Sequence, residues 1–186
     1  MNEHLRIAMR FTLLTTIVFG LLYPLAVTGI TQLIFPAAAN GSLISKDGQL
    51  IGSRLLGQAF SGEKYFHSRP SAAGSGYDAQ SSSPSNLGPT NHALLDRVNA
   101  DVQKFAAENP GVPVPIDLVT TSGSGLDPDI SPAAAAFQAP RVARIRHLDL
   151  NTVRALVTRH TSRRQFGFLG EPRVNVLELN LDLDTQ

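Results

Sequence analysis

Residues 11–35, FTLLTTIVFGLLYPLAVTGITQLIF, form a run of 25 residues without a charge, and this run decides the architecture. Fourteen of them are Leu, Ile, Val or Phe, and each contributes about 0.3–0.6 kcal/mol to insertion near the bilayer centre. As a helix the run reaches roughly 37 Å, enough for a hydrocarbon core of about 30 Å. Its threonines can return their hydroxyls to backbone carbonyls one turn back, and Pro24 is expected to kink the helix. The run therefore predicts one transmembrane helix.

The charges around this run predict its orientation. Arg6 and Arg10 precede it, and the next charge after Arg10 is Lys46. The positive-inside rule then places residues 1–10 in the cytoplasm and exports residues 36–186. A cleaved signal peptide is the alternative, because residues 37–39, all Ala, resemble a cleavage site. Signal peptides carry apolar stretches of about 7–15 residues, so the membrane anchor is favoured.

The composition narrows the functional class. A net charge of +1 over 186 residues gives no general attraction to nucleic acid. The absence of cysteine excludes disulfides, thiolate metal sites and cysteine nucleophiles. The sequence contains no phosphate-binding loop, no Asp-Lys-Thr-Gly motif and no Gly-x-Ser-x-Gly elbow, and its five histidines lack metal-ligand spacing. We therefore expect no catalytic residue and no metal site in this chain.

Residues 36–186 mix strand and helix signals, which predicts a small α+β domain. Asp47-Gly48 is a hairpin turn between two apolar stretches. Residues 61–91 contain fifteen Ser, Gly or Pro among 31 positions, which predicts a long loop. A loop of that length inside a small domain is more often functional or docked than idle.

Further helices and strands are expected after this loop. The first helix begins after Thr90 or Asn91 and stops at residues 109–111, Asn-Pro-Gly. A second follows the Ser131-Pro132 pair and is broken or restarted by Pro140, and a third opens at Asn151. Residues 116–121 are expected to form a short strand. The alternation of leucines with polar residues over 177–184 predicts another strand with one wet face.

The segment from Arg141 to Arg164 carries seven Arg, two His and one acid. Its outline imitates a helix-turn-helix with a basic second helix, so a membrane-tethered DNA-binding regulator is the alternative functional hypothesis. DNA lies in the cytoplasm, whereas this segment is expected to be exported. A basic outer face that meets lipid headgroups or an acidic partner is therefore favoured.

Four ordered motifs carry a resemblance that covers essentially the whole chain. They are residues 65–72 (YFHSRPSA), 85–91 (SNLGPTN), 117–128 (DLVTTSGSGLDP) and 167–181 (GFLGEPRVNVLELNL). In this order, behind a single span, they closely resemble the C subunits of the bacterial Kdp potassium-transporting P-type ATPases. One departure is residues 82–84, Ser-Ser-Pro, where such proteins often carry glycines.

The resemblance implies a place in the bacterial inner membrane, in a complex with three other chains. These are a potassium-translocating channel-like subunit, an ATP-hydrolysing P-type subunit and a small single-span subunit. The subunit resembled here is needed for assembly and has been described as a catalytic chaperone that raises the ATP affinity of the hydrolysing subunit. ATP is then expected to be bound by the partner, with no cofactor and no nucleic acid bound by this chain.

Two sets of residues are expected to contact these partners. In the span, Thr16 and Gly20 are small residues one turn apart, which permits close helix packing. In the exported part, the 61–91 loop and the Ser/Gly loop over 122–127 are expected to form the contact surface. Its candidate residues are Tyr65, Phe66, Arg69, Ser85, Asn86, Ser122, Gly123, Ser124, Gly125 and Asp127.

Overall fold

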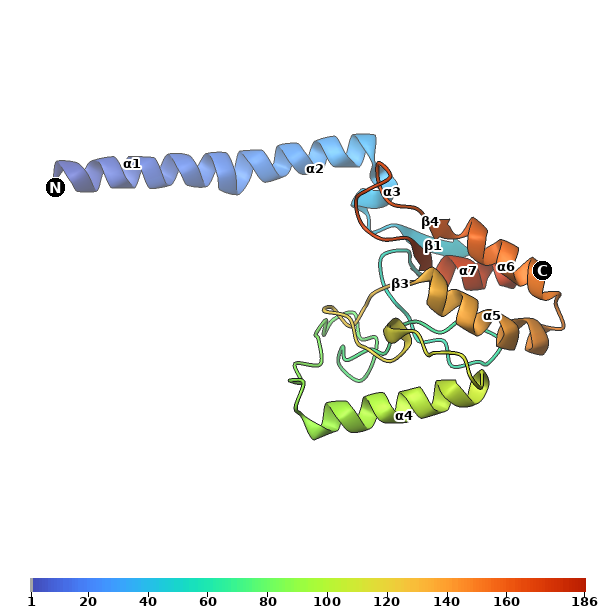
Figure 1. Cartoon of the computed structure of the whole chain (residues 1–186). Coiled ribbons are helices and arrows are strands. Elements are labelled where there is room, and N and C mark those ends of the chain that lie inside the picture. Colours follow the sequence, from blue (N-terminus) through green and yellow to red (C-terminus); the bar gives the residue numbers. More distant parts are fainter. Residues whose placement is uncertain (1) are drawn as a thin grey trace. The chain divides into compact units, whose positions relative to one another are not determined.

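The computed structural model describes residues 2–186 and divides into two compact units (Figure 1). Unit 1 ends at Ser53, and unit 2 runs from Arg54 to Gln186. Unit 1 contains a long apolar helix, and unit 2 combines helices with a small sheet. The predicted fold class, an N-terminal apolar helix followed by a small α+β domain, is confirmed.

Unit 1 begins with one continuous helix, Glu3–Ile34, which is long and apolar enough to cross a membrane. It consists of α1 (Glu3–Ile17), the π-helical turn η1 (Val18–Leu22) and α2 (Tyr23–Ile34). The π-helical turn ends two residues before Pro24, whose missing N–H and bulky ring disturb the normal hydrogen-bond pattern of the preceding turn. As predicted, threonine hydroxyls donate back to the helix, Thr15 to the Phe11 carbonyl and Thr31 to the Val27 carbonyl, each at 2.9 Å.

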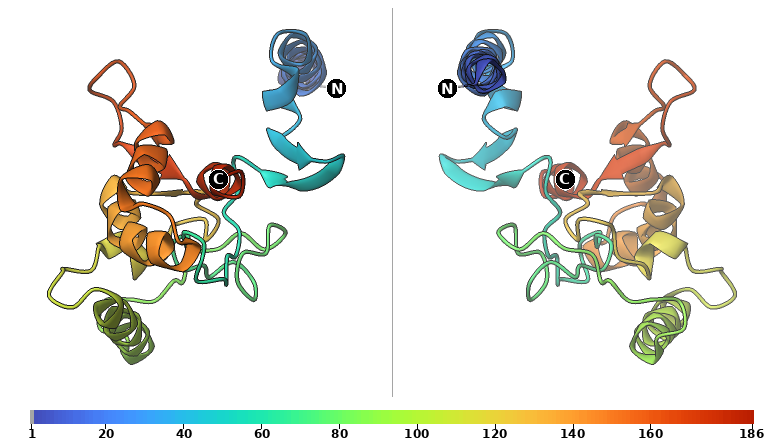
Figure 2. Two further views of the ribbon diagram at one scale, coloured as in Figure 1. Left: turned by 90° about the vertical axis from the view of Figure 1, so that its right-hand side faces the viewer. Right: turned by 90° about the vertical axis from the view of Figure 1, so that its left-hand side faces the viewer.

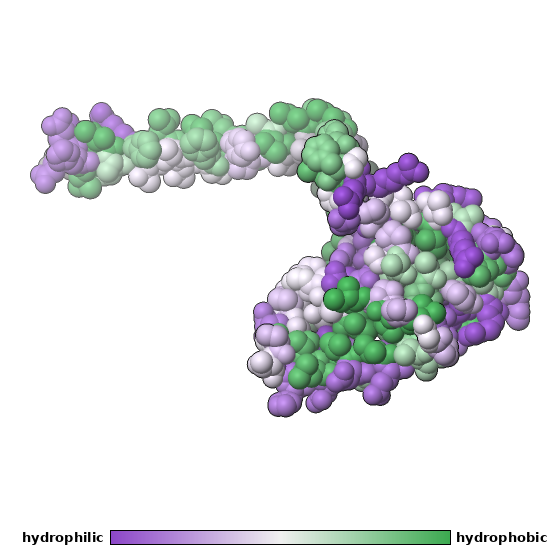
Figure 3. Space-filling view, in the orientation of Figure 1, coloured by the Kyte–Doolittle hydropathy of each residue, from purple (hydrophilic) through white to green (hydrophobic). Residues whose placement is uncertain are grey.

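Hydrophobic side chains cover most of this helix, and hydrophilic ones gather at its N-terminal end (Figure 3). After the helix come the short α3 (Pro36–Ala39) and a hairpin of β1 (Leu43–Lys46) and β2 (Gln49–Ser53). The hairpin is antiparallel, with Lys46 opposite Gln49. Asp47 and Gly48 both have positive φ, 52° and 77°, as the tight turn predicted from Asp-Gly requires.

Unit 2 contains four α-helices, each opened by an N-cap side chain that accepts a backbone N–H. Asn91 caps α4 (His92–Glu108), and Ser131 caps α5 (Pro132–Arg146), as predicted. Asp149 caps α6 (Leu150–Arg159) and Asn175 caps α7 (Val176–Leu183). Between α4 and α5 lies the 3₁₀ turn η2 (Ile116–Leu118).

The sheet of unit 2 has three short antiparallel strands in the order β3-β5-β4. These are β3 (Asp129–Ile130), β5 (Arg173–Asn175) and β4 (Thr161–Ser162). The core gathers around this sheet and helices α5, α6 and α7, and its fully buried side chains include Phe66, Leu118, Val142, Val153, Leu156, Val174 and Leu179. Because Phe66 comes from the 61–91 loop, this irregular segment contributes directly to the core.

The C-terminal strand prediction is wrong, because residues 176–183 form helix α7. Its buried positions, 176, 177, 179, 180 and 183, follow the helical spacing i, i+1, i+3, i+4, i+7. The Asn175 side chain accepts the Glu178 N–H at 3.1 Å and starts the helix. The alternating leucines fitted both periods over so short a segment, and the cap decides for the helix.

Three other sequence predictions are corrected. Residues 116–118 form the 3₁₀ turn η2 instead of a strand, because Pro115 starts the turn and the Thr120 hydroxyl donates to the Ile116 carbonyl. Helix α5 continues through Pro140, since buried side chains on both sides of the proline outweigh its local cost. Helix α6 begins at Leu150 because Asp149, two residues before Asn151, accepts the first free N–H groups.

Candidate functional site

Two buried side-chain amides fix the start of the 61–91 loop. The Phe66 N–H donates to Asn180 Oδ1 and the Asn180 amide donates to the Phe66 carbonyl, both at 2.9 Å. The His67 N–H donates to Gln138 Oε1 at 2.8 Å, and the Gln138 amide donates to the His67 carbonyl at 3.1 Å. Each amide thus bonds the backbone as a neighbouring strand would, and the loop leaves the core in one defined conformation.

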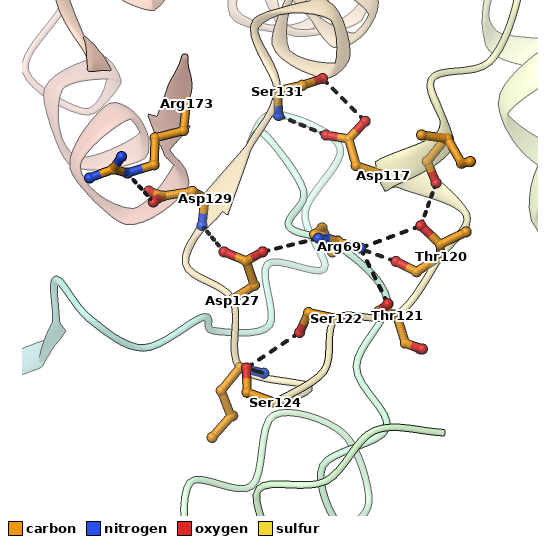
Figure 4. Close-up of polar contacts among 12 residues, drawn as sticks. Arg69, Asp117, Thr120, Thr121, Ser122, Ser124, Asp127, Asp129, Ser131 and Arg173 are labelled. Atoms are coloured by element: carbon orange, nitrogen blue, oxygen red, sulfur yellow. Dashed lines mark hydrogen bonds and ion pairs between the residues drawn. The ribbon is translucent and has the colours of Figure 1, made fainter. Parts of the chain in front are cut away.

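Arg69 then joins this loop to the 120–128 segment (Figure 4). Its Nη1 lies 3.1 Å from Asp127 Oδ2, and its Nη2 donates to the Thr121 carbonyl at 3.2 Å. The Thr120 carbonyl and hydroxyl accept two further, longer bonds of 3.4 Å. A guanidinium suits this role because its donors point in fixed directions from one plane.

A second set of hydrogen bonds ties the same loops at Ser71 and Gly125. The Ser71 hydroxyl donates to the Gly125 carbonyl at 2.6 Å and accepts the Tyr77 N–H at 2.7 Å. The Ser83 N–H donates to the Ser124 carbonyl at 3.0 Å. Gly125 has φ +67°, and an added Cβ would lie 2.7 Å from the Ser83 carbonyl oxygen. We call this joined structure, residues 61–91 with 120–128, the two-loop platform.

A cleft of about 510 Å³ opens beside the platform. The charged residues that line it come from distant segments of unit 2: Arg69, Asp117, Asp127, Asp129, Glu171 and Arg173. The three aspartates bond groups of this chain, because Asp127 pairs with Arg69, Asp129 with Arg173 at 2.9 Å, and Asp117 accepts the Ser131 N–H at 2.7 Å (Figure 4). Burial raises the pKa of Asp129, and Arg173 opposes that shift. Within residues 2–186, no three His, Cys, Asp or Glu side chains are grouped to hold a metal ion.

The structure brings most of the predicted contact residues together in the platform but exposes only some of them. Asn86, Gly123 and Ser124 are exposed, whereas Tyr65, Arg69, Ser85 and Asp127 are partly covered. The side chains of Phe66 and Ser122 and the backbone of Gly125 are buried by this chain itself. In unit 1, Thr16 and Gly20 lie one turn apart on the exposed surface of the apolar helix. Chemically, the platform offers a fixed, mostly self-paired polar surface.

Sequence reasoning missed the residues that hold the platform from beneath. Besides Gln138 and Asn180, the buried Arg141 bonds Glu108 at 3.1 Å, the Tyr65 carbonyl at 3.1 Å and the Glu63 carbonyl. Each of Gln138, Arg141 and Asn180 is a polar side chain at a buried position of a helix. That pattern can be recognised in the sequence only once the bounds of α5 and α7 are known.

The same contacts weaken the DNA-binding alternative. Four of the seven arginines in the Arg141–Arg164 segment pair with acids of this chain: Arg141 with Glu108, Arg146 with Asp184, Arg159 with Asp182 and Arg164 with Glu171. Arg141 is only 5% exposed. A segment that binds the DNA backbone needs these charges free for phosphates.

Acidification is expected to loosen the platform through His67. Burial lowers the pKa of His67 below 6.5, and the nearby Arg141 lowers it further. The unfolded chain then binds a proton more readily than the folded chain, so stability falls as the pH drops through 6.5. The measurement is hydrogen exchange of residues 61–72 between pH 7 and pH 5 in the full-length chain, corrected for intrinsic rates. His67→Gln is expected to flatten this pH dependence, whereas His92→Gln, at the exposed start of α4, should not; equal flattening by both would contradict the assignment to His67.

The sequence is similar to known proteins over nearly its whole length. The family described as KdpC, K+-transporting ATPase c chain, matches residues 5–185. A protein named Potassium-transporting ATPase KdpC subunit from Acidobacterium capsulatum is 62% identical over 98% of both chains. Proteins of the same name from Koribacter versatilis (56% identical, 99% of this chain and 95% of the relative) and Methylococcus capsulatus (57%, 99% and 98%) are similar over comparable lengths.

Proposed function

The chain belongs to the KdpC family, the c chains of K+-transporting ATPases, and from this we propose that it is a non-catalytic accessory subunit that assembles and stabilises a high-affinity potassium-uptake complex. Its helix anchors it once in the inner membrane with residues 1–10 in the cytoplasm. Unit 2 lies on the outer side and clamps the channel-like potassium-translocating subunit. The other partners are the ATP-hydrolysing P-type subunit and the small single-span subunit.

The two-loop platform is the observation that carries this proposal. Arg69 joins the motifs of residues 65–72 and 117–128, and the exposed residues of the platform include Asn86, Gly123 and Ser124. A surface held by buried amides and a guanidinium loses little conformational freedom on binding a partner, so more of the contact energy appears as affinity. Such a surface suits stable docking better than turnover of a substrate.

An effect of this subunit on ATP affinity is indirect in this arrangement. ATP is cytoplasmic, and about 30 Å of hydrocarbon separates it from an exported unit 2. Unit 2 and the helix would favour one conformation of the complex, and a coupling of about 1–3 kcal/mol changes nucleotide affinity several-fold to a hundredfold. ATP is then bound by the P-type subunit alone.

Labelling with an azido-ATP analogue in sealed, correctly oriented membranes tests this arrangement. The hydrolysing subunit should be labelled and this chain should not. Specific labelling between Asn40 and Gln186 would contradict the external-clamp proposal.

In the same membranes, replacing both Thr16 and Gly20 by Leu is expected to lower complex yield and potassium-stimulated ATPase together, because bulky side chains prevent close helix contact. Gly29→Leu, where an added Cβ meets nothing within 4 Å, is the matched control and should change neither.

A reporter fused after Gln186 tests the orientation. Alkaline phosphatase, which folds only outside the cytoplasm, should be active there, and a cytoplasm-dependent fluorescent reporter should be dark. Arg6 and Arg10 are the physical cause, since positive residues beside a span are retained in the cytoplasm. The opposite result would place unit 2 with the chromosome and restore the DNA-binding alternative through Arg141–Arg164.

A further inference from the structure

The connection between β4 and β5 projects from unit 2 as a turn (Figure 2), and several of its large apolar side chains are exposed. We call residues Arg163–Gly170 the aromatic turn. Phe166 is 87% exposed, Phe168 70% and Leu169 47%. Single exposed apolar residues are ordinary on a protein surface, but three neighbouring ones on a projecting turn mark a contact site.

Backbone hydrogen bonds within this turn define its shape. Gln165 and Leu169 exchange two hydrogen bonds of 2.9 Å, and the Phe168 N–H donates to the Gln165 carbonyl at 3.2 Å. Phe166 has φ +53°, a left-handed conformation that costs a residue with a side chain roughly 1–2 kcal/mol. The turn therefore holds Phe166 and Phe168 in a fixed shape at a cost in free energy.

The fixed shape and the flanking charges indicate what covers the turn. A fixed turn can be complementary in shape to a cavity on another protein, whereas a fluid bilayer offers no fixed shape. Arg163 has no ion-pair partner among residues 2–186, and Arg164 pairs with Glu171 at an exposed position. Phe and Arg are both enriched at protein interfaces, and the unpaired positive charge of Arg163 favours an acidic rim on the partner.

The base of the turn also belongs to the cleft beside the platform. Glu171, Pro172 and Arg173 line that cleft together with Arg69 and Asp127. The turn leads into β5, which is held in place because it pairs with β3 along one edge and with β4 along the other. The residues that directly follow the aromatic turn therefore line the same cleft as the two-loop platform.

From these features we infer that the aromatic turn inserts into an apolar socket with an acidic rim on the outer face of another subunit of the transporter. This inference rests on the proposed function, in which unit 2 docks on the complex. Phe166 and Phe168 fill the socket, and Arg163 meets the rim. The turn would then fix the register in which the platform docks.

Photo-crosslinking in membranes that hold the assembled transporter tests the inference. Phe166 is replaced by p-benzoylphenylalanine, and Val112, a 51% exposed residue in another loop of unit 2, receives the same replacement as control. Position 166 should give an adduct with one partner subunit, and position 112 should give none. If the complex assembles and position 166 labels only lipid or nothing, the inference is overturned. If no complex is recovered with the unaltered chain, the proposed function itself has failed.

Substitutions give a second readout. Phe166→Ser with Phe168→Ser should lower recovered complex about tenfold or more, as expected for hot-spot residues, while Val112→Ser stays within about twofold. Arg163→Glu should weaken assembly and Arg163→Lys should retain most of it. Hydrogen exchange of unit 2 checks that each variant is folded. Normal yields for the folded double serine variant and for Arg163→Glu would also overturn the inference.

Discussion

Replacing Phe66 by alanine is expected to lower the free energy of unfolding of unit 2 by about 3–5 kcal/mol, which approaches the whole stability of a small domain. Phe66 is 0% exposed, although it lies in a segment rich in Ser, Gly and Pro. Its removal leaves a cavity between the loop and the helical core. The same backbone position is bonded twice by Asn180, so those bonds are strained when the core relaxes.

Pulse proteolysis of the full-length chain in detergent, across a denaturant series, measures this effect because it reports on unit 2 separately from the helix. Phe168→Ala is the matched control, since Phe168 is 70% exposed on the aromatic turn. Its stability should stay within about 0.5 kcal/mol of the parent. Equal midpoints for Phe66→Ala and the parent would show that the 61–91 loop is an optional cover and not part of the core.

The parts of the fold that depend on neighbouring residues could be predicted from the sequence. The uncharged run gives the long helix, Asp47-Gly48 gives the hairpin, and Asn91 and Ser131 give two helix starts. Each is a local effect, in which a few adjacent residues determine the backbone conformation. These predictions did not require knowledge of what lies across the core.

What the sequence could not show depends partly on distant contacts and partly on short segments whose pattern fits two structures. Helix α5 passes through Pro140 because its flanks are buried against the rest of unit 2. Composition predicts the long loop over 61–91, but it could not show that Gln138 and Asn180, 71 and 114 residues away from their partners, hold its backbone. Periodicity over eight residues could not separate strand from helix at 176–183. The packing around Pro140 and the side chains that hold the 61–91 backbone leave no signal in the adjacent sequence, whereas the Asn175 cap that starts α7 is a local one.

The candidate site shows the same division. The structure separates the residues of the predicted contact segments by role. Arg69 and Gly125 build the platform and are largely turned inward, whereas Asn86 and Gly123 face outward. Only residues 167–170 of the aromatic turn lie inside the 167–181 motif, and Phe166, its most exposed residue, lies before it. A sequence motif can thus contain buried residues that hold a surface in place as well as residues that are exposed on that surface.

Two glycines in one loop separate these roles experimentally. Gly125→Ala is expected to destabilise unit 2 by about 2–4 kcal/mol, combining the left-handed backbone penalty with overpacking. Gly125 has φ +67°, and the new Cβ would lie 2.7 Å from the Ser83 carbonyl oxygen and 2.8 Å from the Ala73 nitrogen, both backbone atoms that cannot rotate away. Because Ser83 and Ala73 belong to the 61–91 loop, the two loops must separate to admit the methyl group.

Gly123→Ala is the matched control, because nothing lies within 4 Å of its added Cβ and its φ is not in the left-handed region. Its unfolding free energy should stay within about 0.5 kcal/mol of the parent. Hydrogen exchange should show faster opening of residues 69–85 in Gly125→Ala only, and the yield of assembled complex should fall with it. A Gly125→Ala chain that keeps its protection but assembles poorly would instead place position 125 in the interface. Unchanged protection together with unchanged assembly would show that the platform is not held at this point.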